Sequence, residues 1–150
     1  MYVLAFDRDE TLDVNPHPER EAVPLEWVRY LAAETEHEVW AIGNQTLTEE
    51  AGIPGVRTAV NRLTEAGTLA EVADPEAVER WLSKEHRLTD WPSRADRIDL
   101  VAHVCPDADR YIVVDDMILS YVDGWTHYYP WDFVDAVRSG ELDVGLPADL

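Results

Sequence analysis

Cysteine and lysine are almost absent from this 150-residue chain, and each shortage excludes a class of protein. Cys105 is the single cysteine, so the chain forms no internal disulfide and no zinc site built from several cysteines. Lys84 is the only lysine among 12 basic residues. Long apolar runs are missing too, and no basic and apolar leader precedes the first predicted strand. We therefore expect neither a membrane span nor a secretory signal, and predict a cytoplasmic protein.

Acidic residues, by contrast, are abundant. The 31 Asp and Glu residues outnumber the 12 Lys and Arg residues and give a formal net charge of −19. The acids are spread through every segment, which is typical of cytosolic proteins from halophilic organisms, where concentrated salt screens the self-repulsion. An acidic mimic that binds a basic partner would show clustered charge instead. Such a surface disfavours nucleic acid as a partner, and we expect a monomer or a small homo-oligomer.

An apolar segment at residues 2–6 ends abruptly in the acidic run 7–11, whose sequence is DRDET. Side chains two apart on an extended segment point the same way, so we expect Asp7, Asp9 and Thr11 to converge. Two neighbouring carboxylates repel each other unless a shared proton or a divalent cation such as Mg²⁺ neutralises them. The motif therefore predicts a phosphate and metal site, although an acidic turn at a strand end gives the same short pattern.

A second apolar segment, residues 111–114, ends in Asp115 and Asp116. Both segments are typical of buried strands in a parallel sheet, where nearly continuous apolar sequence is expected. Because ligands bind at the carboxyl ends of such strands, acids about a hundred residues apart in the chain can meet there. We therefore predict a Mg²⁺ site formed by Asp7, Asp9, Asp115 and Asp116. A solvated turn is the alternative for the second acidic pair.

The two acidic motifs, in this order, resemble motifs I and IV of the haloacid dehalogenase-like (HAD) superfamily. Residues 7–12 are similar to the Asp-Arg-Asp-Gly-Thr-Leu of the histidinol-phosphate and heptose-bisphosphate phosphatases. Residues 39–46 are similar to the motif II strand, and Arg94 fits the basic residue of motif III, 21 residues before Asp115. A response-regulator receiver has the acidic motifs in the reverse order, so that class is excluded.

The resemblance implies an α/β fold, a Rossmann-like three-layer α/β/α sandwich with a mainly parallel sheet. The chain length fits one domain over residues 1–150, and the gaps between the motifs leave no room for a separate cap domain. The activity it implies is a phosphatase that hydrolyses a phosphate monoester through an aspartyl-phosphate intermediate. Asp7 would be the nucleophile and Asp9 the general acid and base, while Arg94 would pair with Asp7 and the phosphate. Thr11 would steady the loop through its hydroxyl.

Mg²⁺ is the implied cofactor, and a phosphorylated molecule of unspecified identity is the implied substrate. The metal would be held by Asp7, the backbone carbonyl of Asp9, and Asp115 or Asp116. The loop at residues 12–22 would form a flap over the active site. Because no cap covers it, we expect an exposed cleft.

Motif II usually supplies a hydroxyl to the phosphate, but the aligned residue here is Gly43. Thr46 can substitute, or the backbone N–H groups of Asn44 and Gln45 can bind the phosphate. Motif III is usually lysine, whereas this chain has Arg94, whose forked head is bulkier. The alternative to an active phosphatase is therefore a catalytically inactive HAD-like scaffold that binds Mg²⁺, phosphate or a partner protein.

Alternating strand and helix signals predict a parallel sheet with helices on both faces. The predicted strands are residues 2–6, 38–42, 111–114 and 125–130, and the predicted helices are residues 24–34, 54–66, 75–86, 94–104 and 131–138. The edge strand and closing helix, at about 125–139, contain five aromatic residues: Trp125, Tyr128, Tyr129, Trp131 and Phe133. These either pack the sheet edge or form a stacking platform for a base or sugar. The five histidines show no metal-ligand spacing.

Overall fold

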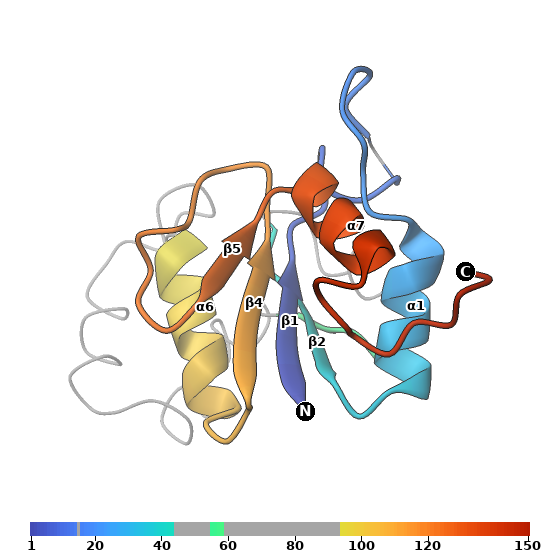
Figure 1. The fold of residues 1–150 in the computed structure, drawn as a ribbon. Coiled ribbons are helices and arrows are strands. Elements are labelled where there is room, and N and C mark those ends of the chain that lie inside the picture. The colour runs from blue at the N-terminus through green and yellow to red at the C-terminus, as the bar shows by residue number, and fades with distance from the viewer. Residues whose placement is uncertain (15, 44–54, 59–93) are drawn as a thin grey trace.

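The computed structural model describes residues 1–14, 16–43, 55–58 and 94–150. They form an α/β fold around an all-parallel, five-stranded sheet with the order β3-β2-β1-β4-β5 (Figure 1). The strands are β1 (Tyr2–Phe6), β2 (Glu38–Ala41), β3 (Arg57–Thr58), β4 (Arg110–Val114) and β5 (Thr126–Tyr128). The sheet grows from β1 through β2 on one side and through β4 on the other. The topological switch point, where ligands bind in such sheets, therefore lies between β1 and β4.

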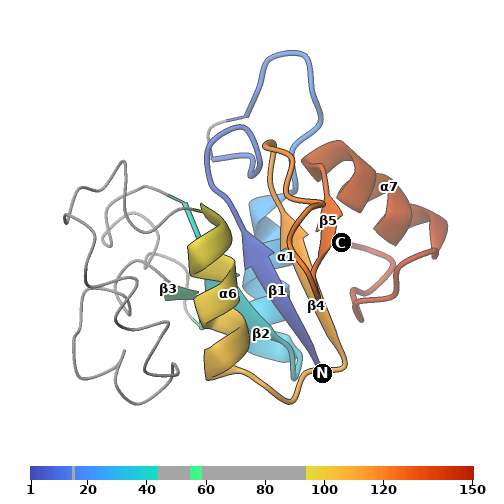
Figure 2. The same cartoon turned by 90° about the vertical axis from the view of Figure 1, so that its left-hand side faces the viewer.

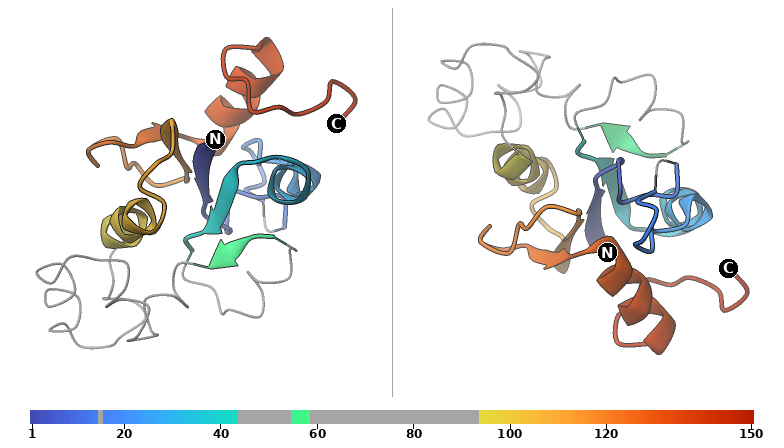
Figure 3. Two further views of the ribbon diagram at one scale, coloured as in Figure 1. Left: turned by 90° about the horizontal axis from the view of Figure 1, so that it is seen from below. Right: turned by 90° about the horizontal axis from the view of Figure 1, so that it is seen from above.

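Helices cover both faces of the sheet (Figures 2 and 3). α1 (Leu25–Glu34) and α7 (Pro130–Ser139) lie on one face, and α6 (Arg94–Val104) lies on the other. Alternate side chains of β1 serve the two faces, because Leu4 packs with α1 and α7 whereas Ala5 packs with α6. The predicted α/β fold with a parallel sheet is confirmed, while the single domain without a cap stays a prediction.

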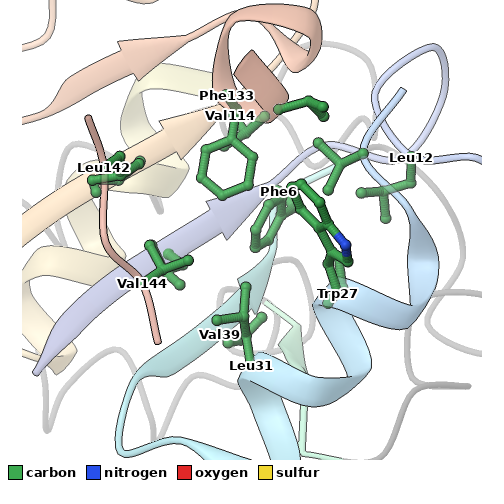
Figure 4. Close-up of a cluster of buried hydrophobic side chains, with 14 of the residues drawn as sticks. Phe6, Leu12, Trp27, Leu31, Val39, Val114, Phe133, Leu142 and Val144 are labelled. Carbon is green, nitrogen blue, oxygen red and sulfur yellow. The ribbon is translucent and has the colours of Figure 1, made fainter. Parts of the chain in front are cut away.

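The larger hydrophobic cluster fills the space between the sheet, α1 and α7 (Figure 4). Phe6 and Trp27 both meet the Phe133 ring at steep angles, with centroid distances of 5.7 and 6.4 Å. Leu142 and Val144, after α7, are buried in the same cluster, so the C-terminal segment folds back over the core. Burying one large apolar side chain stabilises a fold by about 1.5–3 kcal/mol.

The observed elements agree closely with the predicted ones in the described ranges. α1 begins after Pro24, as a helix start with proline predicts. α7 begins at Pro130, which was predicted to end the edge strand, and its last residue is Ser139. The C-cap Gly140 takes a left-handed φ of 81° that glycine adopts without strain. Within these ranges, no helix combines the length and the apolar character needed to cross a membrane.

One predicted element is wrong. Residues 57–58 form the short strand β3, not part of a helix over 54–66. Pairing with β2 decides this, since Arg57 lies opposite Trp40 in the ladder. The Cζ atom of Arg57 lies 4.3 Å from the centroid of the Trp40 ring, and its Nη1 lies 3.2 Å from Oε2 of Glu38. The rest of that predicted helix, and the one over 75–86, lie outside the described residues.

Candidate active site

Two aspartates follow neighbouring strands at the same edge of the sheet. β1 and β4 pair with Phe6 opposite Val114, so Asp7 and Asp115 come next on the two strands. The backbone N–H of Asp7 donates to the Val114 carbonyl at 3.0 Å, which extends the ladder past β1. Asp7 and Asp115 are only 6% and 0% exposed. Two carboxyl groups are thus buried together at the topological switch point.

A tight turn follows Asp7 and brings Thr11 back to it. The Arg8 carbonyl accepts hydrogen bonds from the backbone N–H groups of Thr11 and Leu12, at 3.3 and 3.0 Å, and Glu10 has a φ of 60°. The buried Thr11 hydroxyl donates to Asp7 Oδ2 at 3.2 Å. Thr11 therefore approaches Asp7 as predicted, but through a turn and not along an extended segment.

Arg94, the first residue of α6, joins the two buried aspartates. Its Nη1 lies 3.1 Å from Asp7 Oδ1 and also donates to Asp115 Oδ2. The second Asp115 oxygen accepts the backbone N–H of Met117 at 2.9 Å. The Arg94 side chain is 11% exposed, and its Nε–H has no hydrogen-bond partner among the residues that the structure describes. The Arg94 guanidinium therefore bridges two carboxyl groups, and its Nε–H is not used in these contacts.

Burial makes ionisation of these aspartates costly. The pKa of Asp7 is raised to about 7, chiefly by burial and next by the Asp115 carboxylate, while Arg94 opposes the increase. Burial also raises the pKa of Asp115. Burial lowers the pKa of Arg94, but the carboxylates of Asp7 and Asp115 raise it by more, so the guanidinium stays charged. Arg94 alone does not compensate the negative charge of the pair.

Asp116 adds a third carboxyl group to this cluster. One oxygen from each of Asp7, Asp115 and Asp116 lies within 4.8 Å of the other two. Carboxylate oxygens at such spacing suit a hard divalent cation. The pKa of Asp7, raised chiefly by burial and next by Asp115, points the same way, because a bound cation would offset the cost of ionising this buried carboxyl group. The three aspartates therefore form a group that can hold a metal ion.

Asp9 lies apart from these three carboxyl groups. Its side chain is 40% exposed, and its Oδ1 lies 3.2 Å from Nη1 of Arg8. It does not belong to the carboxylate cluster of the described residues. The predicted convergence is thus confirmed for Thr11 and Asp7 but not for the Asp9 side chain, because the turn redirects it. The roles predicted for the Asp9 carboxyl and carbonyl groups stay predictions.

The end of β2 comes to the same edge of the sheet. The backbone N–H of Ile42 donates to the Phe6 carbonyl at 3.0 Å, and the buried Gly43 follows. Asn44, Gln45 and Thr46 lie outside the described residues, so their predicted contacts with phosphate stay predictions.

Two residues that support the site were not identified from the sequence. Arg97, buried one turn after Arg94, donates to the Ile42 carbonyl at 3.0 Å and so fixes α6 against the end of β2. His127 Nε2 lies 2.9 Å from the Asp115 backbone carbonyl. The three-residue spacing of the two arginines on one helix face was the only available signal.

Comparisons with protein-family models, with curated proteins and with solved structures find no match for this chain. The resemblance to the HAD-like superfamily therefore rests on the motifs and their order. A function is accordingly inferred from the geometry of the site itself.

Proposed function

We propose that this protein is a Mg²⁺-dependent phosphohydrolase that cleaves a phosphate monoester through an aspartyl-phosphate on Asp7. The observation that carries the proposal is the surroundings of Asp7. It is buried at the end of the central strand, contacts Thr11 and Arg94, and lies beside two further carboxyl groups. A buried aspartate with only a structural role gains nothing from a cluster of like charges, whereas perturbed carboxyl groups gather at catalytic sites.

In the first step, an oxygen of the Asp7 carboxylate attacks the phosphorus atom. The new O–P bond forms as the bond to the leaving oxygen breaks, and Asp9 gives that oxygen a proton. The Asp9 side chain is 40% exposed, so water can reach it. The ionised form of Asp7 is required, and it is accessible near pH 7 because the pKa lies at about 7.

In the second step, Asp9 removes a proton from a water molecule that attacks the aspartyl-phosphate. Phosphate leaves and the Asp7 carboxylate is restored. Arg94 can donate its Nε–H to a phosphate oxygen, since that group has no partner in the described part of the chain. Mg²⁺, held by Asp7, Asp115, Asp116 and the Asp9 carbonyl, would neutralise charge on the transferring group.

The proposal includes a HAD-like fold, a three-layer α/β/α sandwich in one cytoplasmic domain without a cap. The switch point beside β1 and the helices on both faces of the sheet support the layered fold, while the location and the missing cap are part of the proposal. The motif order points to the same superfamily.

Asp7→Asn tests the nucleophile, because an amide cannot form the aspartyl-phosphate. In molar KCl with Mg²⁺, we expect wild type to hydrolyse at least one ester of a broad phosphomonoester panel, and Asp7→Asn to lose activity by several orders of magnitude. Asp135→Asn, which removes the same charge from the exposed face of α7, serves as the matched control and should keep full activity. Undiminished hydrolysis by Asp7→Asn would exclude the covalent mechanism.

An inactive scaffold that holds a cation or phosphate is the second candidate. It is favoured by Gly43, which offers no hydroxyl at the end of β2, and by the bridging position of Arg94. Beryllium fluoride separates the two, because a competent Asp7 with Mg²⁺ should form the acyl-phosphate mimic. A scaffold should bind Mg²⁺, seen as a higher melting temperature, yet form no such adduct and hydrolyse no ester, and Gly43→Thr should not rescue it.

A further inference from the structure

The aromatic residues near the C-terminus separate into two groups. Trp125, Tyr128 and Phe133 pack into the hydrophobic clusters on the two faces of the sheet. Tyr129 and Trp131 belong to neither cluster and remain partly exposed. Their rings stack on each other, with centroids 4.8 Å apart and an interplanar angle of 3°. The core therefore does not account for this pair.

The stacked pair lies at the edge of the sheet that carries the aspartates. Tyr129 follows β5 directly, and Trp131 lies in the first turn of α7. The His127 ring packs edge-to-face against Tyr129 with a centroid distance of 4.7 Å, and its Nε2 lies 2.9 Å from the Asp115 carbonyl. A continuous row of rings thus leads from the backbone of the candidate active site to Trp131.

A residue of the flap covers the outer end of this row. The guanidinium of the exposed Arg20 lies 5.1 Å from the centroid of the Trp131 ring. An exposed cation–π contact is weaker than the stacking of a nucleobase on an aromatic side chain. Guanidinium planes also stack on bases. A flat ligand that enters between Trp131 and Arg20 therefore gains at least as much stacking free energy as the cation–π contact loses.

From this row of rings we propose that the substrate is a mononucleotide, with its phosphate at Asp7 and its base on the Tyr129–Trp131 pair. The inference rests on the proposed function and names its substrate class. Stacking does not read base edges, so we expect weak discrimination among bases. The net charge of −19 disfavours a polynucleotide, whose many phosphates such a surface repels.

AMP and ribose 5-phosphate provide the test, because ribose 5-phosphate has the same sugar and phosphate with a hydroxyl group in place of the base. In molar KCl with Mg²⁺, we expect wild type to hydrolyse AMP with a kcat/KM about tenfold or more above that of ribose 5-phosphate. Trp131→Leu should remove most of that ratio, and Trp131→Phe should retain much of it. Tyr121→Leu, which removes a 67% exposed aromatic ring outside the row, is the control and should leave the ratio unchanged.

Equal efficiency on the two esters in wild type would overturn the mononucleotide inference and leave the phosphatase proposal intact. A higher kcat/KM on a 5′-phosphorylated oligonucleotide than on AMP would also overturn it. The wild-type ratio needs no variant, so misfolding of Trp131→Leu does not block the test. Hydrolysis of no ester would count against the proposed function. Calorimetric binding to Asp7→Asn then tests the inference by itself, since AMP should bind about tenfold more tightly than ribose 5-phosphate.

Discussion

Asp7 combines burial with a need for negative charge, and its protonation controls what the site can do. The pKa of Asp7 is raised to about 7, chiefly by burial. Near neutral pH, the cation-free protein is therefore a mixture of molecules with protonated Asp7 and molecules with ionised Asp7. In the proposed mechanism the ionised form is the nucleophile, and it is also the better ligand for a cation. A cation that binds there therefore competes with the proton and activates the group at the same time.

Stability of the cation-free protein should fall as pH rises. The folded-state pKa of Asp7 lies above the unfolded value of about 3.9, so its stabilising contribution is complete below pH 4 and is lost as the pH passes through about 7. The raised pKa of Asp115 acts in the same direction. Thermal unfolding in EDTA and molar KCl should show a lower melting temperature at pH 8 than at pH 5.

Asp7→Asn isolates the contribution of this one group. The amide does not ionise, so only wild type should lose stability through this group. The melting temperature of Asp7→Asn minus that of wild type, both in EDTA, should therefore be larger at pH 8 than at pH 5. A constant difference across that range would show that the Asp7 pKa is not raised. Added Mg²⁺ should stabilise wild type more at pH 8 than at pH 5, because the metal binds the ionised carboxylate.

Glu10 sits in the turn after Asp7 with a φ of 60°, a conformation that costs a non-glycine residue about 1–3 kcal/mol. Glycine is free of this strain but loses about 0.5–1 kcal/mol more entropy on folding. Glu10→Gly should therefore stabilise the protein by up to about 2.5 kcal/mol, and the melting temperature should rise by about 2–4 °C per kcal/mol. Glu10→Gln corrects for the removed charge, and Glu10→Val should lower the melting temperature. A lower melting temperature for Glu10→Gly than for wild type would contradict the proposal that the backbone of Glu10 is strained.

At the scale of elements, α6 acts as a rigid support for the site. Arg94 at its start reaches the aspartates that follow β1 and β4, while Arg97 one turn later holds the end of β2. Side chains three apart share a helix face, so one helix fixes the carboxyl ends of three adjacent strands. A site held by helices and strands keeps its geometry better than one built only on loops.

His37, just before β2, connects two segments that are distant in sequence, at the end of the sheet opposite the candidate active site. Its Nδ1 accepts the backbone N–H of Tyr2 at 3.0 Å, and its Nε2 lies 3.1 Å from the carbonyl of Val144. The ring also stacks on Tyr2 with a centroid distance of 5.0 Å. It therefore links the start of β1 to the C-terminal segment that covers the core.

His37→Ala should destabilise the protein by about 1–3 kcal/mol, because it leaves two partly buried backbone groups without this partner. At the size of this domain, the melting temperature should fall by about 2–4 °C per kcal/mol. His17→Ala provides the control, since the His17 ring accepts the N–H of Glu19, two residues away in an exposed loop, at 3.0 Å. Equal decreases in melting temperature for His37→Ala and His17→Ala would contradict the role of His37 in connecting the two segments.

At the scale of the whole molecule, charge dominates. A formal charge of −19 on 150 residues produces self-repulsion that salt screens, with a Debye length near 10 Å at 0.1 M and 3 Å at 1 M. Raising KCl from 0.1 M to 2 M at pH 7.5 should raise the melting temperature, most steeply below about 1 M. The same titration near the isoelectric point of about 4.3 should have little effect, since the net charge is then close to zero. A salt response of equal size at both pH values would indicate a cause other than screening.

Local patterns along the chain were sufficient to predict most of the described elements. Apolar runs such as residues 2–6 specify buried strands, and Pro24 marks a helix start. The pairing of Asp7 with Asp115 was also predictable, because parallel strands with acids at their carboxyl ends bring those acids to one edge. These features depend on interactions between residues that are close in sequence, or on rules common to all parallel sheets.

The remaining features depend on contacts between distant segments, which only the tertiary structure decides. The strand at residues 57–58 exists because β2 offers an edge to pair with. The turn with Glu10 at positive φ redirects Asp9 and leaves Asp7 in contact with Thr11. Burial and the contact with Arg94 set the charge balance of Asp7 and Asp115. The same holds for the aromatic residues, since packing alone separates Phe133 in the core from Trp131 in the exposed stack. A residue's burial and its charged neighbours are properties of the folded chain, and these determine both its pKa and its freedom to bind a ligand.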